Sequence, residues 1–181
     1  YNIIRNAYYV GINHIETAPS YGNAEILIGK ALEKLEKEEN ISRKYWIITT
    51  KVLPKGDFDF LKHNFNNSLN NLNLKRINNL AIHGLNLKEH LDWVRYGEGN
   101  KFIKWIFEKR LVDQFGFSSH GSYSLIEEAI KCNLFSFCNL HVHYLDQSKI
   151  SLAQLALNKG MGVLAISPAD KGGRLYSPSN I

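Results

Sequence analysis

The chain is poor in cysteine and has no long hydrophobic run. Its 181 residues include only two cysteines, Cys132 and Cys138, and their spacing matches neither a zinc knuckle nor a redox pair. We therefore expect reduced thiols in the core and no disulfide framework. The longest apolar runs are strand-sized, shorter than the roughly 20 residues that span a bilayer. Because the N-terminus also lacks the basic-then-apolar layout of a secretory signal, the sequence predicts a soluble, cytoplasmic protein without a membrane partner.

Charge of one sign is not concentrated anywhere in the sequence. The formal net charge is +5, but the 22 Lys and Arg residues are spread among acidic residues, as in segment 30–39. A basic protein can bind phosphate-bearing partners, yet a nucleic-acid site needs a basic stripe or patch. We therefore predict no nucleic-acid partner. The composition, with 44% hydrophobic and 22% charged residues, is that of one ordinary globular domain over residues 1–181.

Apolar periodicity and glycine punctuation predict an α/β protein in which about six strands alternate with about six helices. The predicted strands are residues 11–17, 45–52, 78–83, 112–118, 135–144 and 162–167. The predicted helices follow residue 22 and cover residues 58–72, most of 86–110, 124–131 and 148–159. A capping box formed by Ser124 and Glu127 is expected to begin the fourth of these helices. Buried strands separated by helices imply a parallel sheet, either doubly wound or closed as a barrel.

Polar residues at the strand ends favour the barrel. No Gly-x-Gly-x-x-Gly follows an early strand, so the usual dinucleotide fingerprint of the doubly wound fold is absent. Glu16 and Tyr21 follow the first predicted strand, Lys51 ends the second and His83 ends the third. In a parallel barrel the C-terminal ends of neighbouring strands converge, and active sites are built there. We expect these four side chains to face one cleft.

Each of these four residues also has a purely structural explanation. Tyr21 could be a turn aromatic, Lys51 a solvated strand end, His83 a core histidine and Glu16 a helix-terminus carboxylate. Their combination points to acid–base chemistry. Tyrosine has a reference pKa of about 10, so a tyrosine that donates a proton at neutral pH needs a nearby cation to stabilise its phenolate. Lys51 can supply that cation, and Glu16 can supply the counter-charge that a buried lysine requires.

Four segments resemble, in order, the successive signatures of the aldo-keto reductase superfamily. They are Gly-Ile-Asn-His-Ile-Glu-Thr-Ala-Pro-Ser-Tyr-Gly-Asn-Ala-Glu at 11–25, Ile-Thr-Thr-Lys at 48–51, Ala-Ile-His-Gly at 81–84 and Phe-Gly-Phe-Ser-Ser at 115–119. The resemblance implies a (β/α)8 TIM barrel that reduces an aldehyde or ketone with NADPH, or alternatively NADH. The positions of the family's Asp, Tyr, Lys and His tetrad fall on Glu16, Tyr21, Lys51 and His83.

The resemblance also implies a role for each member of the tetrad. The nicotinamide would give hydride to the carbonyl carbon of a small-molecule substrate, while Tyr21 protonates the carbonyl oxygen. Lys51 would favour the phenolate form of Tyr21, and His83 would orient or polarise the carbonyl group. Glu16 departs from the family's aspartate by one methylene. We expect its ion pair with Lys51 to survive that change.

Cofactor contacts are implied in three segments. A Ser-Asn pair of the family, a glutamine on its sixth strand and the turn after its seventh strand match residues 118–119, 139 and 166–171 of this chain. The predicted cofactor contacts are Ser118, Ser119, Asn139, Ser167, Pro168, Ala169 and Lys171. Three positions depart from the family pattern. Ser119 replaces Asn, Asn139 replaces Gln, and Ile166 stands where many members stack an aromatic on the nicotinamide.

His141 and His143 are candidate metal ligands. Alternate residues of one strand share a face, and two imidazoles there could hold a metal ion. No carboxylate or third histidine occurs at a spacing that completes a site, so we predict no metal and assign the pair to a barrel wall or substrate pocket. A metal-dependent barrel hydrolase is the disfavoured alternative, and stoichiometric bound metal would reveal it.

Matched to the family, the chain contains about six of the eight barrel strands. The first and eighth strands are absent, which predicts an incomplete barrel with two unpaired edges. A homodimer, a swapped element or a longer reading frame could cover these edges, and some bacterial members with a similar segment at 167–175 carry an iron–sulfur extension. We expect weak cofactor binding and little reductase activity from this chain. The alternative function is a non-catalytic nucleotide-binding or regulatory subunit on the same fold.

Overall fold

The computed structural model describes residues 1–170 and Tyr176, in which six strands form one parallel sheet. The strands, in spatial as in chain order, are β1 (His14–Glu16), β2 (Ile47–Val52), β3 (Ile77–Ile82), β4 (Val112–Ser119), β5 (Phe137–His141) and β6 (Gly162–Ile166). The helices are α1 (Asn2–Tyr9), α2 (Ala24–Glu39), α3 (Phe58–Leu72), α4 (Lys88–Tyr96), α5 (Glu98–Glu108), α6 (Tyr123–Lys131) and α7 (Ile150–Asn158), with a short 3₁₀ helix at Arg43–Tyr45.

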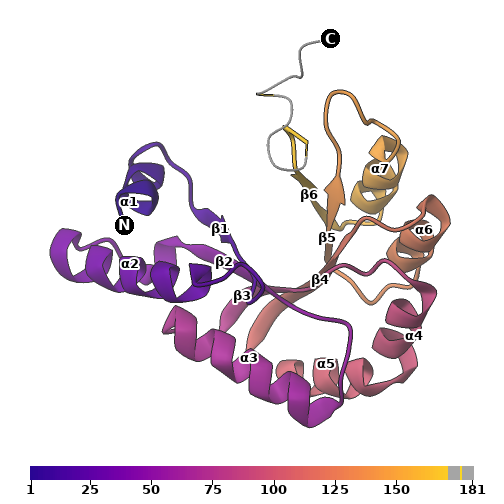
Figure 1. The fold of residues 1–181 in the computed structure, drawn as a ribbon, viewed down its shortest axis with the longest axis horizontal. Helices are drawn as coiled ribbons and strands as arrows, with labels where there is room; N and C mark the ends of the chain where they lie inside the picture. Colours follow the sequence, from indigo (N-terminus) through magenta and orange to yellow (C-terminus); the bar gives the residue numbers. More distant parts are fainter. Residues whose placement is uncertain (171–175, 177–181) are drawn as a thin grey trace.

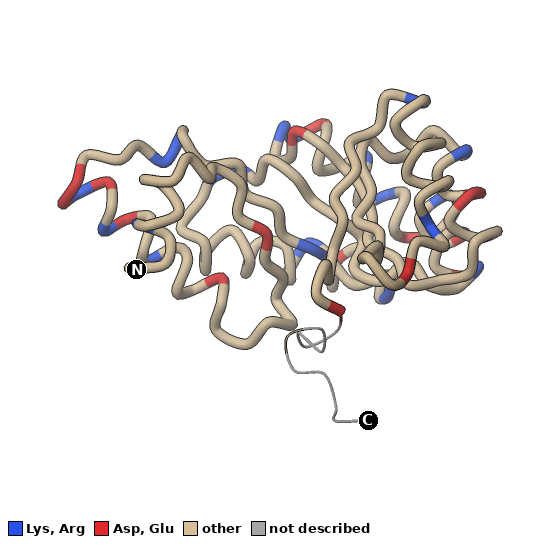
Figure 2. Tube along the Cα trace, turned by 90° about the horizontal axis from the view of Figure 1, so that it is seen from above, with Lys and Arg blue, Asp and Glu red and all other residues tan. Residues whose placement is uncertain are grey.

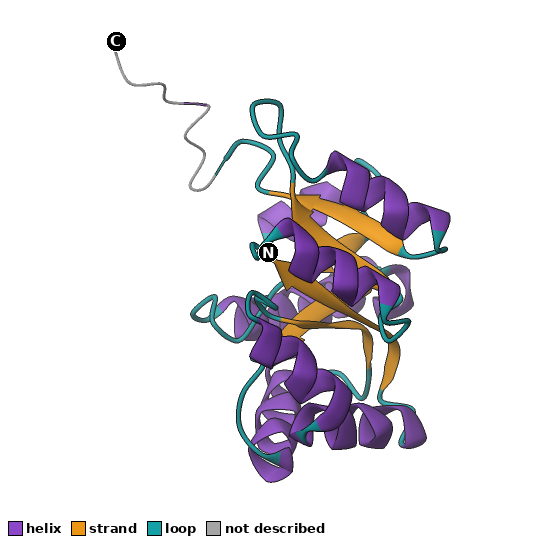
Figure 3. Cartoon of the chain, turned by 90° about the vertical axis from the view of Figure 1, so that its right-hand side faces the viewer, coloured by secondary structure: helices purple, strands orange, loops and turns teal. Residues whose placement is uncertain are grey.

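The sheet is curled into a half-barrel with the helices outside it (Figure 1, Figure 3). Each strand pairs in parallel with the next one along the chain, so all C-terminal strand ends lie at one edge of the sheet. Within residues 1–170, β1 pairs only with β2 and β6 only with β5. The predicted parallel, incomplete barrel is confirmed.

Two predicted strands are shorter than expected by four or more residues. The first covers His14–Glu16 instead of 11–17, and the fifth covers Phe137–His141 instead of 135–144. The fifth ends early because the chain turns back on itself, so that His143 forms an antiparallel bridge with Asp146. A local turn therefore takes the backbone hydrogen bonds that a longer strand would have given to the sheet.

The predicted capping box of α6 is wrong. The N-cap is Ser122, whose Oγ accepts a hydrogen bond from the backbone N–H of Leu125 at 3.3 Å. Glu127 instead accepts a hydrogen bond from Lys131 at 2.8 Å, one turn along the same helix. Two serines two residues apart both fit the N-cap preference, and the tertiary path into the helix selects the first.

Helix α3 shows how the core forms. Its asparagine-rich sequence places Leu61, Phe65 and Leu72 at helical spacing, and all three side chains are fully buried. The ring of Phe65 packs edge-on against that of Phe102 in α5, with centroids 5.8 Å apart. The predicted amphipathic helix is confirmed with its bounds, and its apolar face closes one side of the core between helices and sheet.

The exposed surfaces carry mixed charge. Lys and Arg alternate with Asp and Glu along the helices, as the sequence predicted (Figure 2). In the part of the chain that the structure describes, no helix is both long and apolar enough to cross a membrane. Both cysteines are free thiols. Burial raises the pKa of Cys138 to about 12 and also raises the pKa of half-buried Cys132.

Gly29 permits close packing between α2 and α3. A Cβ at this position would lie 2.4 Å from the carbonyl oxygen of Asn71 and 2.9 Å from the carbonyl carbon of Leu72. Both are backbone atoms, which cannot rotate away. We expect Gly29→Ala to lower the free energy of unfolding by about 1–3 kcal/mol through overpacking. Urea denaturation measures this, and Lys30→Ala on the exposed side of α2 should change the value by less than about 0.5 kcal/mol.

The sign of the Gly29 result is informative. Replacing a glycine by alanine in an uncrowded helix stabilises the helix by about 1 kcal/mol, because alanine has the higher helix propensity. A more stable Gly29→Ala variant would therefore show that α2 and α3 are not packed as closely as the structure describes.

Candidate active site

Lys51 is the centre of a polar cluster at the C-terminal ends of β1 and β2. Although it is a lysine, it is only 1% exposed. Its Nζ donates to Glu16 Oε1 at 2.7 Å, to the backbone oxygen of Thr17 at 3.0 Å and to the hydroxyl of Tyr21 at 3.2 Å. An ammonium group has three N–H donors, and all three have an acceptor here. The expected ion pair between Glu16 and Lys51 is present.

Glu16 lies between Lys51 and Asn139. Its second oxygen, Oε2, accepts from Nδ2 of Asn139 at 2.6 Å. Glu16 lies on β1 and Asn139 on β5, four strands away in the sheet, so the bond reaches across the concave interior of the half-barrel. Both carboxylate oxygens thus have a donor, which fixes the rotamer of Glu16 and, through it, the position of Lys51.

Tyr21 lies in the turn after β1 and is 48% exposed. Its ring packs edge-on against the imidazole of His83 at a centroid distance of 5.7 Å, while Lys51 Nζ lies 4.8 Å from the ring centroid. The hydroxyl of Tyr21 is therefore in hydrogen-bond contact with a buried cation, while the residue itself remains partly exposed to solvent.

His83 follows β3 and is half-buried. Its backbone N–H donates to the carbonyl of Val52 at 2.7 Å, which holds the residue at the strand end, and its Nδ1 lies 3.3 Å from Ser20 Oγ. Burial lowers the pKa of His83, and the positive charge of Lys51 lowers it further. The imidazole is therefore neutral at neutral pH.

The lowered pKa of His83 makes stability depend on pH. The unfolded chain, with a histidine pKa of about 6.5, binds the proton more readily than the folded chain does. The stabilising contribution is thus fully present above about pH 6.5 and is lost as the pH falls toward the lower, folded pKa. In urea denaturation from about pH 7 to pH 5, we expect His83→Gln to lose less stability than the wild type. His63→Gln, which changes an exposed histidine of α3, should keep the wild-type slope; equal slopes for all three chains would contradict the prediction.

The four predicted tetrad residues line one cleft of about 700 Å³. This volume lies within the usual range for small-molecule sites. One wall comes from the ends of β1, β2 and β3, and the opposite wall comes from the end of β6. The lining residues are Glu16, Ser20, Tyr21, Lys51, Leu53, His83, Gly84, Asn86, Ser118, His120, Leu164, Ala165, Ile166 and Ser167.

The predicted cofactor residues fall into two groups. Ser118 and Ser167 line the cleft, and Pro168 and Ala169 follow in the turn after β6. Ser119 and Asn139 are buried and do not line it. Ser119 Oγ donates to the carbonyl of Leu85 at 2.6 Å, and the Asn139 amide binds Glu16. The seventh predicted contact, Lys171, lies outside the described residues.

Sequence reasoning missed three features of this site. Ser20 contacts His83, His120 lines the cleft, and Asn139 binds Glu16. The first two had a weak signal, because Ser20 directly precedes Tyr21 and His120 directly follows the predicted pair at 118–119. The third had none, since residues 16 and 139 meet only through the curl of the sheet.

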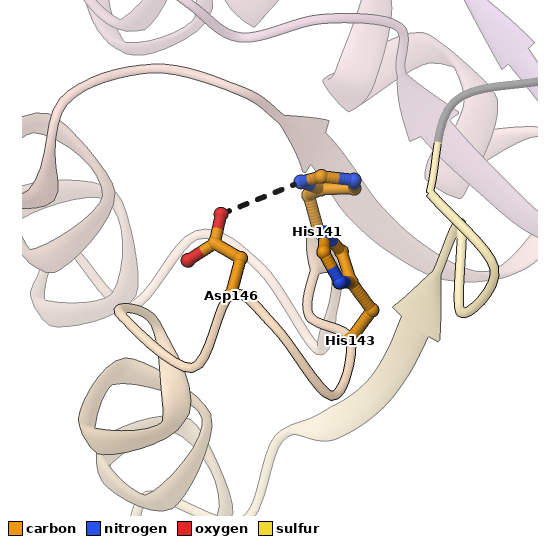
Figure 4. A group of neighbouring side chains, drawn as sticks. All are labelled: His141, His143 and Asp146. Atoms are coloured by element: carbon orange, nitrogen blue, oxygen red, sulfur yellow. Dashed lines mark ion pairs between the residues drawn. The ribbon is translucent and has the colours of Figure 1, made fainter. Parts of the chain in front are cut away.

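The expectation that no carboxylate accompanies His141 and His143 is wrong. Asp146 offers a ligand atom that lies within 4.8 Å of one from each histidine (Figure 4). The antiparallel bridge between His143 and Asp146 folds the carboxylate back beside the imidazoles. The prediction assumes an extended strand through residue 144, and the turn after His141 changes which residues meet.

The model of a family described as "Aldo/keto reductase family" matches residues 1–177. The D-arabinose 1-dehydrogenase of Saccharomyces cerevisiae is 28% identical over 158 residues, and the match covers 78% of this chain and 46% of that protein. This chain therefore spans less than half the length of that curated relative.

Solved structures share the fold. An aldo-keto reductase from a Medee basin deep-sea metagenome library aligns with a TM-score of 0.77 and 23% identity, over 100% of this chain and 63% of that one. A Bombyx mori aldo-keto reductase in complex with NADP aligns with a TM-score of 0.72 and 21% identity, over 91% of this chain and 56% of that one.

Proposed function

Since the chain belongs to the aldo/keto reductase family, we propose that it carries the active site of an oxidoreductase that reduces an aldehyde or ketone with NADPH. NADH is the alternative cofactor. One observation carries the proposal. Lys51 Nζ lies 3.2 Å from the hydroxyl of Tyr21 and 2.7 Å from Glu16, at the edge of a cleft that His83 also lines.

Tyr21 is the proposed proton donor. Its hydroxyl faces the cleft and loses a proton to the carbonyl oxygen as the carbon is reduced. The ammonium of Lys51 stabilises the phenolate that remains, because the two groups are in hydrogen-bond contact and Lys51 is buried. Glu16 balances the charge of Lys51 and keeps its Nζ pointing at Tyr21. Glu16 is thus a positioning residue, while Tyr21 and Lys51 act on the reacting oxygen.

His83 is proposed to orient the substrate. A neutral imidazole has one N–H and one lone pair. When Ser20 donates to Nδ1, the ring proton lies on Nε2 and is left to donate to a carbonyl oxygen in the cleft. A protonated His83 would compete with Tyr21 as the acid, so the lowered pKa suits this division of roles.

The residues around the cleft fit a nicotinamide cofactor in part. Ser118 and Ser167 offer polar groups and Ile166 offers an apolar wall. Asn139, which is buried and outside the lining, has an Oδ1 without a hydrogen-bond partner among the described residues. A bound nicotinamide would supply the hydride. A solved Bombyx mori aldo-keto reductase holds NADP, which supports NADPH as the cofactor of this chain. Ser118, Ser167, Pro168 and Ala169 are the described residues proposed to bind it.

The experiment uses NADPH that carries deuterium on the reactive carbon of its nicotinamide. We expect deuterium to appear on the former carbonyl carbon when the chain, at high concentration, is incubated with a panel of aldehydes and ketones. Mass spectrometry of the alcohol products measures the transfer. NADPH binding without transfer to any member of the panel would refute the reductase proposal.

A non-catalytic nucleotide-binding or regulatory role is the second candidate. It is favoured by Ser119 and Asn139, which do not line the cleft and whose Oγ and Nδ2 are bonded to Leu85 and Glu16. Such a chain would bind NADPH and transfer no deuterium. The expectations of low activity and of a homodimer that covers the edges at β1 and β6 stay predictions, which calorimetry with NADPH and measurement of the oligomeric state would test.

A further inference from the structure

A second polar cluster lies at the end of β5, outside the tetrad. His141 is the last residue of β5, and His143 and Asp146 belong to the turn that follows it. Each offers one potential ligand atom, and these atoms all lie within 4.8 Å of one another. The side chains converge on one point of the loop (Figure 4). Two imidazoles and a carboxylate are a common ligand set of zinc and related transition metals.

The carboxylate of Asp146 is already oriented toward His141. Its Oδ1 accepts from the hydroxyl of Ser148 at 2.6 Å and from the backbone N–H of Ser148 at 3.1 Å. These bonds fix the orientation of the carboxylate. Its other oxygen, Oδ2, faces Nδ1 of His141 at 3.8 Å. Ser148 thus holds one oxygen and leaves the second for a ligand.

Hydrogen bonds and distances around the two histidines indicate the tautomer of His143 and the direction of both Nε2 atoms. Nδ1 of His143 accepts a hydrogen bond from the backbone N–H of Leu145 at 3.3 Å, so the proton of the neutral ring is on Nε2. Nε2 of His143 lies 3.9 Å from Asp170 Oδ1, and Nε2 of His141 lies 3.7 Å from the same oxygen. Both rings therefore direct Nε2 toward Asp170.

The imidazole of His141 is buried, and one of its nitrogens lacks a hydrogen bond among the described residues. The residue is 8% exposed, and its buried Nε2 has no hydrogen-bond partner within residues 1–170 and Tyr176. An unpaired buried polar atom is costly and needs an explanation. In metal sites, a ligating imidazole gives the N–H of its other nitrogen to a carboxylate, which fixes the ring and strengthens the ligand. A shift of under about 1 Å would bring Asp170 into that role.

We propose that His141, His143 and Asp146 bind one divalent transition-metal ion of the zinc class. The ligands are Nδ1 of both imidazoles and Oδ2 of Asp146, with water at the fourth position. The metal takes the lone pair of His143 Nδ1, so the long 3.3 Å hydrogen bond from the Leu145 N–H gives way when the ion binds. Asp170 accepts the Nε2 protons. In a tetrahedral zinc site with bonds of about 2.0–2.1 Å, ligand atoms lie roughly 3.3 Å apart. The observed 3.8 Å between His141 Nδ1 and Asp146 Oδ2 needs to shorten by only about half an ångström.

The site would join two parts of the fold. Asp170 follows β6, whereas the three ligands follow β5, so a bound ion would stabilise the contact between the two loops. The ring of His120, which lines the cleft, lies 5.5 Å from that of His141. The metal site is thus adjacent to the cleft without sharing a residue with the tetrad. It does not depend on the reductase proposal.

The test is titration of the untagged 181-residue chain, freed of metal by a chelator, with Zn²⁺ in a calorimeter. We expect one equivalent to bind, and Co²⁺ to give the visible absorption of a four-coordinate site. His141→Gln and Asp146→Asn, which each remove a ligand, should weaken Zn²⁺ binding by about 100-fold or more, and Asp170→Asn by about 10-fold. His63→Gln is the matched control and should bind as the wild type does.

Three results would overturn the proposal. They are no stoichiometric binding to the wild type, unchanged affinity in His141→Gln or Asp146→Asn, and a larger loss in Asp170→Asn than in Asp146→Asn. The last would show that Asp170 is the ligand and Asp146 the outer carboxylate. Asp146→Asn keeps the size of the side chain, and far-ultraviolet circular dichroism checks that each variant is folded.

Discussion

Tyr21→Phe is expected to lower kcat for carbonyl reduction by a factor of about 10² to 10⁴, the usual contribution of a positioned general acid. The substitution removes the hydroxyl that lies 3.2 Å from Lys51 Nζ and keeps the ring that packs on His83. Binding of NADPH should not change, because the hydroxyl serves only the reacting oxygen. Single-turnover kinetics with excess protein measure the effect even when turnover is slow.

The matched control for this variant is Tyr96→Phe. Tyr96 is 74% exposed at the end of α4 and takes no part in the cleft. Its loss should change kcat less than about twofold, since surface substitutions away from a site are close to neutral. If Tyr21→Phe also retained kcat within a factor of two, another group would have to protonate the substrate.

Lys51→Met is expected to affect both activity and stability. A unit charge about 4 Å from a developing phenolate, at an effective dielectric of about 20, contributes at most about 4 kcal/mol, or about three decades of rate. We therefore expect kcat to fall by about 10² to 10³. The variant also leaves Glu16 without its ion-pair partner in a largely buried site, which should lower the free energy of unfolding by about 1–3 kcal/mol.

A second substitution separates these two effects. Lys51→Met combined with Glu16→Gln removes the unpaired charge, so urea denaturation should show stability regained relative to the single variant. Activity should remain low, because the cation beside Tyr21 is still missing. Lys55→Met serves as the control, since Lys55 is an exposed lysine four residues away. A double variant with wild-type kcat would show that Lys51 acts only by neutralising Glu16.

Local sequence determined much of the fold. Leu61, Phe65 and Leu72 repeat at helical spacing through an asparagine-rich segment, and α3 has the bounds that this pattern predicts. The tetrad positions could be located as a group because they lie at the ends of consecutive parallel strands. Neighbouring strands in such a sheet must bring those ends together, so the convergence of Glu16, Lys51 and Tyr21 follows from topology.

The remaining contacts depend on tertiary geometry that a single sequence does not encode locally. Asn139 meets Glu16 because of the curvature of the sheet, and Asp146 meets His141 because a turn replaces the end of a predicted strand. Both are contacts between polar residues that the sequence identifies by type. The sequence does not reveal the path of the chain that brings these residues together.

The bond between Asn139 and Glu16 also bears on how the chain folds. It joins residues 123 positions apart, whereas each neighbouring pair of strands is linked by one much shorter crossover. Strands can pair in sequence as the chain emerges, at a modest loop-closure entropy for each step. The carboxylate of Glu16 gains its second partner only after β5 has joined the sheet. The contacts of Lys51 with Glu16 and Tyr21 need only β1 and β2, whereas the full hydrogen-bond network of Glu16 requires a non-local contact.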